Sequence, residues 1–154
     1  MKKTLGLLIF ILFAVLSCGN KSVFNENIVI PEARWDNTQL PYFDVNIDDT
    51  VGVHSFYINV RHLESYRYSN LYVFLHTTFP NGNQTHDTIE CTLAHPDGSW
   101  VGRGTGSMRS SEILLNESLR FPVKGTYHFE IEQAMREPVL KGITDIGLHI
   151  EKER

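Results

Sequence analysis

Apolar and polar residues alternate with a period of two through most of this chain, and no other feature constrains its fold as strongly. Residues that alternate in this way point to opposite faces of a β-strand, so each apolar set marks a face that must be covered. Residues 71–75 are apolar on both faces, which predicts a central strand. The clearest segments are residues 43–47, 56–60, 71–75, 88–93, 127–131 and 146–150.

Turn signals separate these segments. Asn81-Gly82 and Asp97-Gly98 are tight-turn pairs, because both residue types tolerate a positive φ. Residues 99–101 follow the second pair and complete a predicted hairpin. Residues 111–120 are compatible with either a short helix or a strand. Residues 132–142 are predicted to form a structured loop, because the proline within them would break a helix.

Seven or eight strands with no helices between them predict antiparallel pairing. A single antiparallel β-sandwich is the all-β fold that buries so many one-sided strands. A jelly-roll topology is favoured over an immunoglobulin-like one, because the Cys-Trp-Cys framework of immunoglobulin domains is absent. Residues 34–154 are predicted to form this sandwich, since a chain of 154 residues normally folds as one domain.

The first eighteen residues are organised like a bacterial lipoprotein signal. Lys2 and Lys3 precede an apolar run over residues 5–16 that is too short to span a bilayer as a helix. The run ends at Ser17-Cys18, which resembles the lipobox in which a cysteine thiol is acylated. We expect residues 1–17 to be a cleaved lipoprotein signal peptide and residues 18–33 to be the lipidated N-terminus and tether. The alternative is a plain secretory peptide in which Cys18 lies near the cleavage point by chance. The short apolar patch at residues 28–30 is either a first edge strand or the end of the tether.

Charge and cysteine content exclude several classes of protein. The formal net charge of −4 becomes −6 once Lys2 and Lys3 leave with the signal peptide. Nucleic-acid-binding domains need a basic stripe, so no nucleic-acid partner is expected. Cys91 shares its strand face with Ile89 and Leu93, which predicts a small buried side chain and not a reactive thiol.

Sequence motifs for catalysis are missing. The chain has no Gly-x-Ser-x-Gly motif and no cysteine in an activating context. Five potential metal ligands lie close together, but their spacing matches no zinc or calcium motif. These ligands are His86, Asp87, Glu90, His95 and Asp97. We therefore predict a non-enzymatic protein with no catalytic residue, no metal and no cofactor.

Two predicted loops are candidates for partner binding. Tyr66, Arg67 and Tyr68 lie in a polar loop between strands, where aromatic and arginine side chains often contact partners. Met135 and Arg136 lie in the loop before the last strand, and an exposed Met and Arg suit an adaptable contact. Both loops could instead only close an end of the sandwich.

Short motifs occur in a fixed order along nearly the whole chain. Their order and spacing resemble those of the GldH family of gliding-motility lipoproteins. Beginning with the lipobox at Cys18, the motifs are Trp35 with Pro41 and Phe43, Asp49-Thr50, Val60-Arg61, Tyr66 and Tyr68 with Asn70-Leu71, Pro80, Asp87-Thr88, residues 98–102, Phe121-Pro122, Gly125-Thr126-Tyr127, Met135-Arg136, Leu140, Gly142-Ile143 and Asp145-Ile146-Gly147.

The resemblance implies a small cell-envelope lipoprotein required for surface gliding, in machinery that overlaps a secretion system for adhesins. It implies no catalytic residues, and only the role of Cys18 as lipid attachment site transfers from the family. Envelope proteins of the gliding or secretion apparatus are the expected partners, and the lipid anchor is the expected contact with a membrane. Surface-exported lipoproteins of gliding bacteria tend to carry acidic residues directly after the cysteine. Here the first one is Glu26, which favours the periplasmic side of the outer membrane.

The alternative function is a carbohydrate-binding module tethered to the envelope. Such a module stacks sugars on exposed aromatic side chains, so it requires Trp35 and Trp100 to lie on an open face of the sandwich. Burial of both tryptophans would argue against it.

Overall fold

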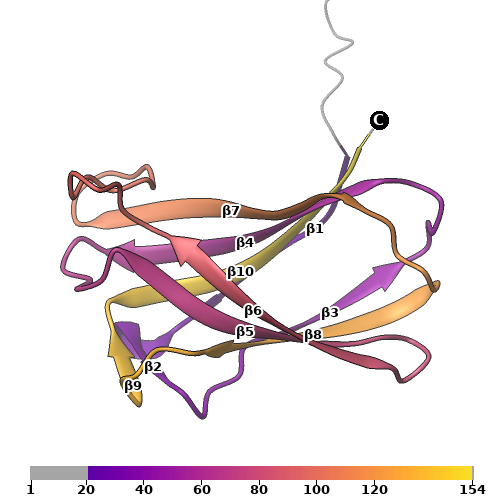
Figure 1. Cartoon of the computed structure of the whole chain (residues 1–154), viewed down its shortest axis with the longest axis horizontal. Coiled ribbons are helices and arrows are strands. Elements are labelled where there is room, and N and C mark those ends of the chain that lie inside the picture. Colours follow the sequence, from indigo (N-terminus) through magenta and orange to yellow (C-terminus); the bar gives the residue numbers. More distant parts are fainter. Residues whose placement is uncertain (1–20, 154) are drawn as a thin grey trace, which may run out of the picture.

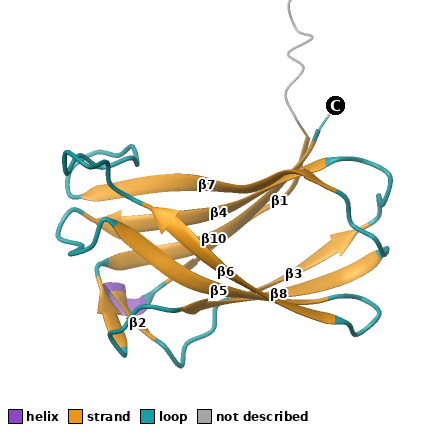
Figure 2. Cartoon of the chain, in the orientation of Figure 1, coloured by secondary structure: helices purple, strands orange, loops and turns teal. Residues whose placement is uncertain are grey.

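The computed structural model describes residues 21–153, which form two antiparallel sheets packed face to face (Figure 1). The first sheet has the strand order β1-β10-β4-β7, the second has the order β3-β8-β5-β6, and a short ribbon pairs β2 with β9. Figure 2 shows strands and loops along almost all of the described chain, with one 3-10 turn at Pro31–Ala33. The predicted all-β sandwich is confirmed. The strands are β1 (Lys21–Val29), β2 (Arg34–Asp36), β3 (Tyr42–Ile47), β4 (His54–Leu63), β5 (Asn70–Thr78), β6 (Gln84–Thr92), β7 (Met108–Leu119), β8 (Gly125–Gln133), β9 (Val139–Lys141) and β10 (Ile143–Lys152).

The eight long strands form four antiparallel pairs, in which the first strand pairs with the last, the second with the second-last, and so on. β1 pairs with β10, β3 with β8, β4 with β7 and β5 with β6. Pairing of β10 with β4 and of β8 with β5 then completes each sheet.

Alternation along the strands gives the two sheets a shared core. On β3, Phe43, Val45 and Ile47 are buried while the residues between them are exposed. Across the core, the ring of Phe129 on β8 packs against Phe56 on β4 with centroids 5.3 Å apart. Full burial of an apolar side chain of this size stabilises the fold by about 1.5–3 kcal/mol. The core between the sheets is therefore what holds the sandwich together.

The first strand changes the predicted boundary of the domain. The sequence predicts a tether over residues 18–33, whereas Lys21–Val29 forms β1 and pairs with β10 along its length. The alternation does not reveal this strand because a polar residue interrupts its inner face. Phe24 and Ile28 pack against the core, but Glu26 lies on the same face between them and is exposed. The folded domain therefore includes residues from 21 onward.

The segment over residues 111–120 is a strand. It belongs to β7, whose register against β4 shifts twice beside Phe56. These irregularities interrupt the alternation, which is why the sequence is compatible with a helix as well.

The loop predicted over residues 132–142 is shorter in the structure and covers residues 134–138. The first residues of the predicted loop end β8, and its last residues include β9.

Different strand ends and loops lie at the two ends of the sandwich. Lys21, Lys152, His54 and Leu119 lie side by side on the four strands of the first sheet and mark one end, which we call the tether end. Figure 1 shows the start of β1 beside the C-terminal end of β10 there. The loops that follow β4 and β8 lie at the opposite end, which we call the distal end. Because a strand rises about 3.3 Å per residue, the ten residues of β10 separate the two ends by about 30 Å.

Gly147 provides a test of whether β1 is an integral strand. It lies on β10 opposite Asn27, and a Cβ there would lie 2.6 Å from the carbonyl oxygen of Glu26. We expect Gly147→Ala to displace β1 and to lower the free energy of unfolding by about 1–3 kcal/mol, the usual cost of overpacking. Hydrogen exchange should be faster in the β1 amides of this variant, while the exposed control Thr126→Ala leaves them unchanged. Unchanged β1 exchange in Gly147→Ala would contradict an integral β1.

Candidate functional site

Two loops that are far apart in the sequence meet at the distal end. The β4–β5 loop covers residues 64–69 and the β8–β9 loop covers residues 134–138. Tyr68 joins them, because its hydroxyl donates a hydrogen bond to Glu137 Oε1 at 2.5 Å. Donation to this carboxylate raises the pKa of Tyr68, so the phenol keeps its proton at neutral pH. The two loops therefore form one surface, which we call the distal loop cluster.

Tyr66 anchors the β4–β5 loop to the core. Its side chain is only 4% exposed, and its hydroxyl donates to the carbonyl oxygen of Asn70 at 2.9 Å. Burial raises the pKa of this phenol well above its usual range. Gly142 lies directly against it, at a φ of +100°, and a Cβ on Gly142 would come within 3.2 Å of the Tyr66 ring. In this position Tyr66 fixes the loop, and very little of its side chain is exposed.

Met135 has a similar anchoring position in the β8–β9 loop. It is half-buried against the core, and its sulfur accepts the backbone N–H of Tyr72 at 3.3 Å. Gln133 secures the same loop, since its side chain accepts the backbone N–H of Met135 and donates to the carbonyl oxygen of Glu137. The exposed Met expected from the sequence is therefore half-buried, and several hydrogen bonds hold the loop that carries it.

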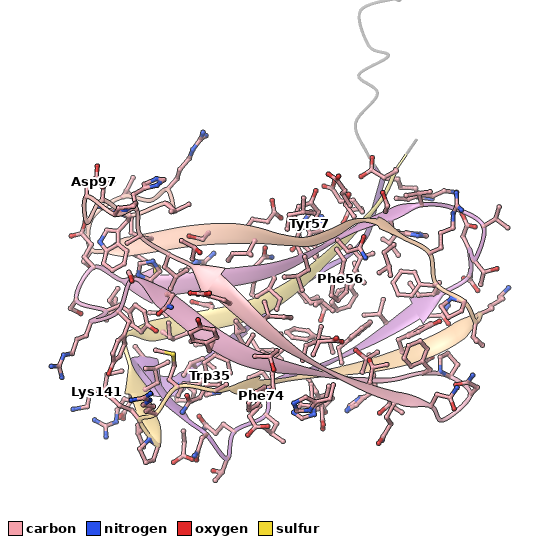
Figure 3. All side chains as sticks on the ribbon, in the orientation of Figure 1. Trp35, Phe56, Tyr57, Phe74, Asp97 and Lys141 are labelled. Atoms are coloured by element: carbon pink, nitrogen blue, oxygen red, sulfur yellow. The ribbon has the colours of Figure 1, made fainter. Side chains whose placement is uncertain are left out.

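Exposed cations gather at the distal end. Arg67 and Arg136 are the exposed members of the predicted set, and neither side chain has an ion pair within residues 21–153. Arg34 and Lys141 lie opposite each other in the β2–β9 ribbon and are likewise exposed and unpaired in the described chain. Figure 3 shows Lys141 at this end. The sequence does not indicate this second pair, because each residue lies in a three-residue strand with no alternation to reveal it.

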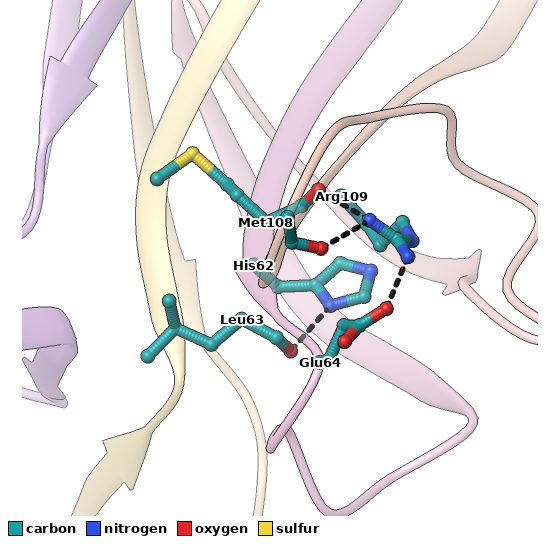
Figure 4. A network of polar contacts seen from close by, with 6 residues as sticks. His62, Leu63, Glu64, Met108 and Arg109 are labelled. Carbon is teal, nitrogen blue, oxygen red and sulfur yellow. Dashed lines mark hydrogen bonds and ion pairs between the residues drawn. The ribbon is translucent and has the colours of Figure 1, made fainter.

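A third loop supports the cluster from the side of the first sheet. The β6–β7 connection is held by Arg109, which pairs with Glu64 and donates to the carbonyl oxygens of Gly106 and Met108 at 3.0 and 2.9 Å (Figure 4). His62 lies within this network, and burial lowers its pKa, so its ring is neutral at neutral pH. Glu64, the first residue of the β4–β5 loop, is therefore fixed to the start of β7.

The distal end is suited to recognition. Within residues 21–153, no group of three or more His, Cys, Asp and Glu side chains is placed to hold a metal ion. Two of the potential ligands noted in the sequence have structural partners, since Asp97 accepts from Ser99 in its turn and Glu90 accepts from the side chain of Asn70. Exposed guanidinium groups on rigid loops are instead suited to binding carboxylates on another protein.

Cys18, the predicted lipid attachment site, lies outside the described residues. The described chain begins at Lys21, at the tether end, so Cys18 precedes β1 by only a few residues. Across residues 21–153 we find no helix with the length and hydropathy needed to cross a bilayer.

Comparisons with known proteins cover almost the full chain. The gliding motility lipoprotein GldH homolog of Christiangramia forsetii is 35% identical over 161 aligned positions, which cover 99% of this chain and 98% of the relative. The gliding motility lipoprotein GldH of Flavobacterium johnsoniae is 31% identical over 158 positions, which cover 98% of each. No solved structure matches the chain significantly. The family model described as GldH lipoprotein matches residues 22–150, and the chain therefore belongs to the GldH lipoprotein family.

Proposed function

We propose that this protein acts without catalysis in the gliding-motility and associated secretion machinery, through contacts between its distal loop cluster and envelope proteins of that apparatus. Its relatives are named as gliding motility lipoproteins, which supports the setting. Acylated Cys18 would hold the domain at the outer membrane. A periplasmic orientation is supported by the absence of acidic residues between Cys18 and Glu26.

The position of the distal loop cluster is the observation that supports this proposal most. Lys21 begins β1 at the tether end, whereas the Tyr68–Glu137 hydrogen bond joins the two loops at the opposite end. A domain held by its tether end presents the distal loop cluster away from the bilayer, with a reach of about 30 Å along the strands. Confinement at a membrane raises the effective concentration of that cluster, so weak contacts suffice for assembly.

The carbohydrate-binding alternative loses its main support. Trp35 is fully buried and donates its indole N–H to the carbonyl oxygen of Gln39 at 2.9 Å. Trp100 is half-buried and packs on the ring of His62 with centroids 4.5 Å apart. Trp35 therefore cannot contribute to an open platform for sugar stacking, and one side of Trp100 is covered by His62.

Replacement of Cys18 tests the anchor. We expect Cys18→Ser to release the protein from the membrane fraction, because stable anchoring needs acyl chains and each buried CH₂ contributes about 0.8 kcal/mol. Cys91→Ser is the matched control. Cys91 is buried with a pKa raised to about 12, so its thiol is not available for acylation. Fractionation and palmitate labelling measure both variants. Retention of Cys18→Ser in the membrane would contradict the proposed anchor.

Charge reversal at the two exposed arginines tests the distal loop cluster. We expect Arg67→Glu and Arg136→Glu each to lower copurification of envelope partners. The double variant should lower it at least about tenfold, which is the usual effect of removing arginine anchors from an interface. Colony spreading should fall in parallel, while stability changes by no more than about 0.5 kcal/mol, as is usual for surface substitutions.

Arg120→Glu is the matched control for these variants, since Arg120 is exposed but lies near the tether end. It should leave copurification and spreading at wild-type levels. Equal effects of Arg120→Glu and the distal variants would mean that overall charge matters and the distal loop cluster does not.

A further inference from the structure

One side of the sandwich is closed and the other is open. Between the edge strands β1 and β3, Phe24 packs edge-to-face on Phe43 with centroids 6.0 Å apart. Between the edge strands β6 and β7 the sheets instead leave a groove of about 660 Å³. Phe56 and Phe129 line its inner wall, and Figure 3 shows Phe56 between the two sheets. The volume is in the range of natural binding sites, about 300–1,000 Å³.

The rim of the groove is apolar and incompletely covered. Ile89 of β6 lines one side, and Ile113, Leu115 and Leu119 of β7 line the other. All four side chains pack against the core but are only half-buried. In a closed sandwich, residues on these faces would be fully buried, so an occupant with apolar side chains would complete the core here.

The edge of β6 offers a regular backbone template. Its residues pair with β5 from Gln84 to Thr92 without a register shift, and no other described strand pairs with it. An edge strand of this kind presents unpaired N–H and C=O groups that a further strand can use. β6 contains neither proline nor lysine, which commonly protect edges, whereas the pairing of β7 with β4 is irregular.

One unpaired carboxylate at the rim indicates the charge of the occupant. Asp87 lies opposite Leu75 in the β5–β6 register, on the face of β6 that lines the groove, and it is exposed. Within the described chain it has no hydrogen bond or ion pair. Glu90 also borders the groove, but its carboxylate is bonded to Asn70. A cationic side chain would pair with Asp87, whereas an anionic group such as a fatty-acid carboxylate would be repelled.

We propose that this groove binds an extended segment of a partner envelope protein, which adds as a strand to β6, fills the groove with alternating apolar side chains and places a Lys or Arg against Asp87. This inference rests on the proposed function, because it assumes that the protein acts through protein partners. It adds a second contact surface, distinct from the distal loop cluster.

Photocrosslinking in intact cells tests this proposal on the full-length lipoprotein. A benzophenone amino acid replaces either Thr85, which is exposed and lines the groove, or its neighbour Gln84, which lies on the outer face of β6. We expect crosslinks to a partner protein from position 85 and not from position 84. Mass spectrometry of the crosslinked peptide should identify a segment with alternating apolar residues and a Lys or Arg.

Charge variants make the test specific to Asp87. Asp87→Lys should lower the crosslink yield at position 85 at least about tenfold, because like charges across an interface cost several kcal/mol. Asp87→Asn should give an intermediate yield. The matched control is Glu26→Lys, which reverses an exposed acid on the inner face of the closed edge and should leave the yield unchanged. Thermal melting of each variant shows whether a lost crosslink reflects unfolding.

Several outcomes would overturn the proposal. These are crosslinks from position 85 to lipid only, crosslinks to a second copy of this chain only, equal yields from positions 84 and 85, and an unchanged yield in folded Asp87→Lys. A benzophenone in place of Ser65, an exposed residue of the β4–β5 loop, separates the two proposals and leaves Arg67 in place. If position 65 captures a partner and position 85 captures none, the groove proposal fails and the proposed function stands. If neither position captures a protein, both fail.

Discussion

The pairing of the first strand with the last determines where every functional part of this protein lies. β1 runs along β10 from Lys21 at the tether end to Val29 near the distal end, and Gly147 allows their close approach. A flexible tether over residues 18–33 would leave the domain free to reorient at the membrane. Because β1 is part of the first sheet, only residues 19 and 20 separate Cys18 from the described fold. The start of β1, to which the proposed anchor would be joined, and the distal loops are therefore at opposite ends of the domain.

Rigidity at the distal end is suited to weak contacts between proteins. Tyr66 and Met135 hold the two loops on the side that faces the core, and the Tyr68–Glu137 hydrogen bond joins the two loops at the surface. Loops that are already ordered lose little conformational entropy when a partner binds, so more of the contact energy appears as affinity. The exposed arginines are then presented on a scaffold that does not need to rearrange.

Alternation in the sequence predicts the strands whose inner face is apolar without a break, the edge strand β3 among them, and it fails where that pattern is interrupted. β3, β4, β5 and β8 follow the pattern because one face of each is buried, and Cys91 is buried as expected. β1 is missed because an exposed glutamate interrupts its inner face, and β7 is ambiguous because its register shifts. The meeting of Tyr68 with Glu137, and the groove beside Asp87, depend on which strands become neighbours. No local pattern encodes that information.

The most direct measurement is the distance of each end of the domain from the bilayer. Spin labels at Lys124→Cys, near the tether end, and at Lys141→Cys, at the distal end, can be placed on the full-length acylated protein in vesicles containing a lipid-bound relaxation agent. Cys91 is buried and does not compete for the label. We expect strong relaxation at position 124 and little at position 141, because the strands separate the two ends by about 30 Å. Equal relaxation at both positions, or stronger relaxation at position 141, would contradict the placement of anchor and contact surface at opposite ends.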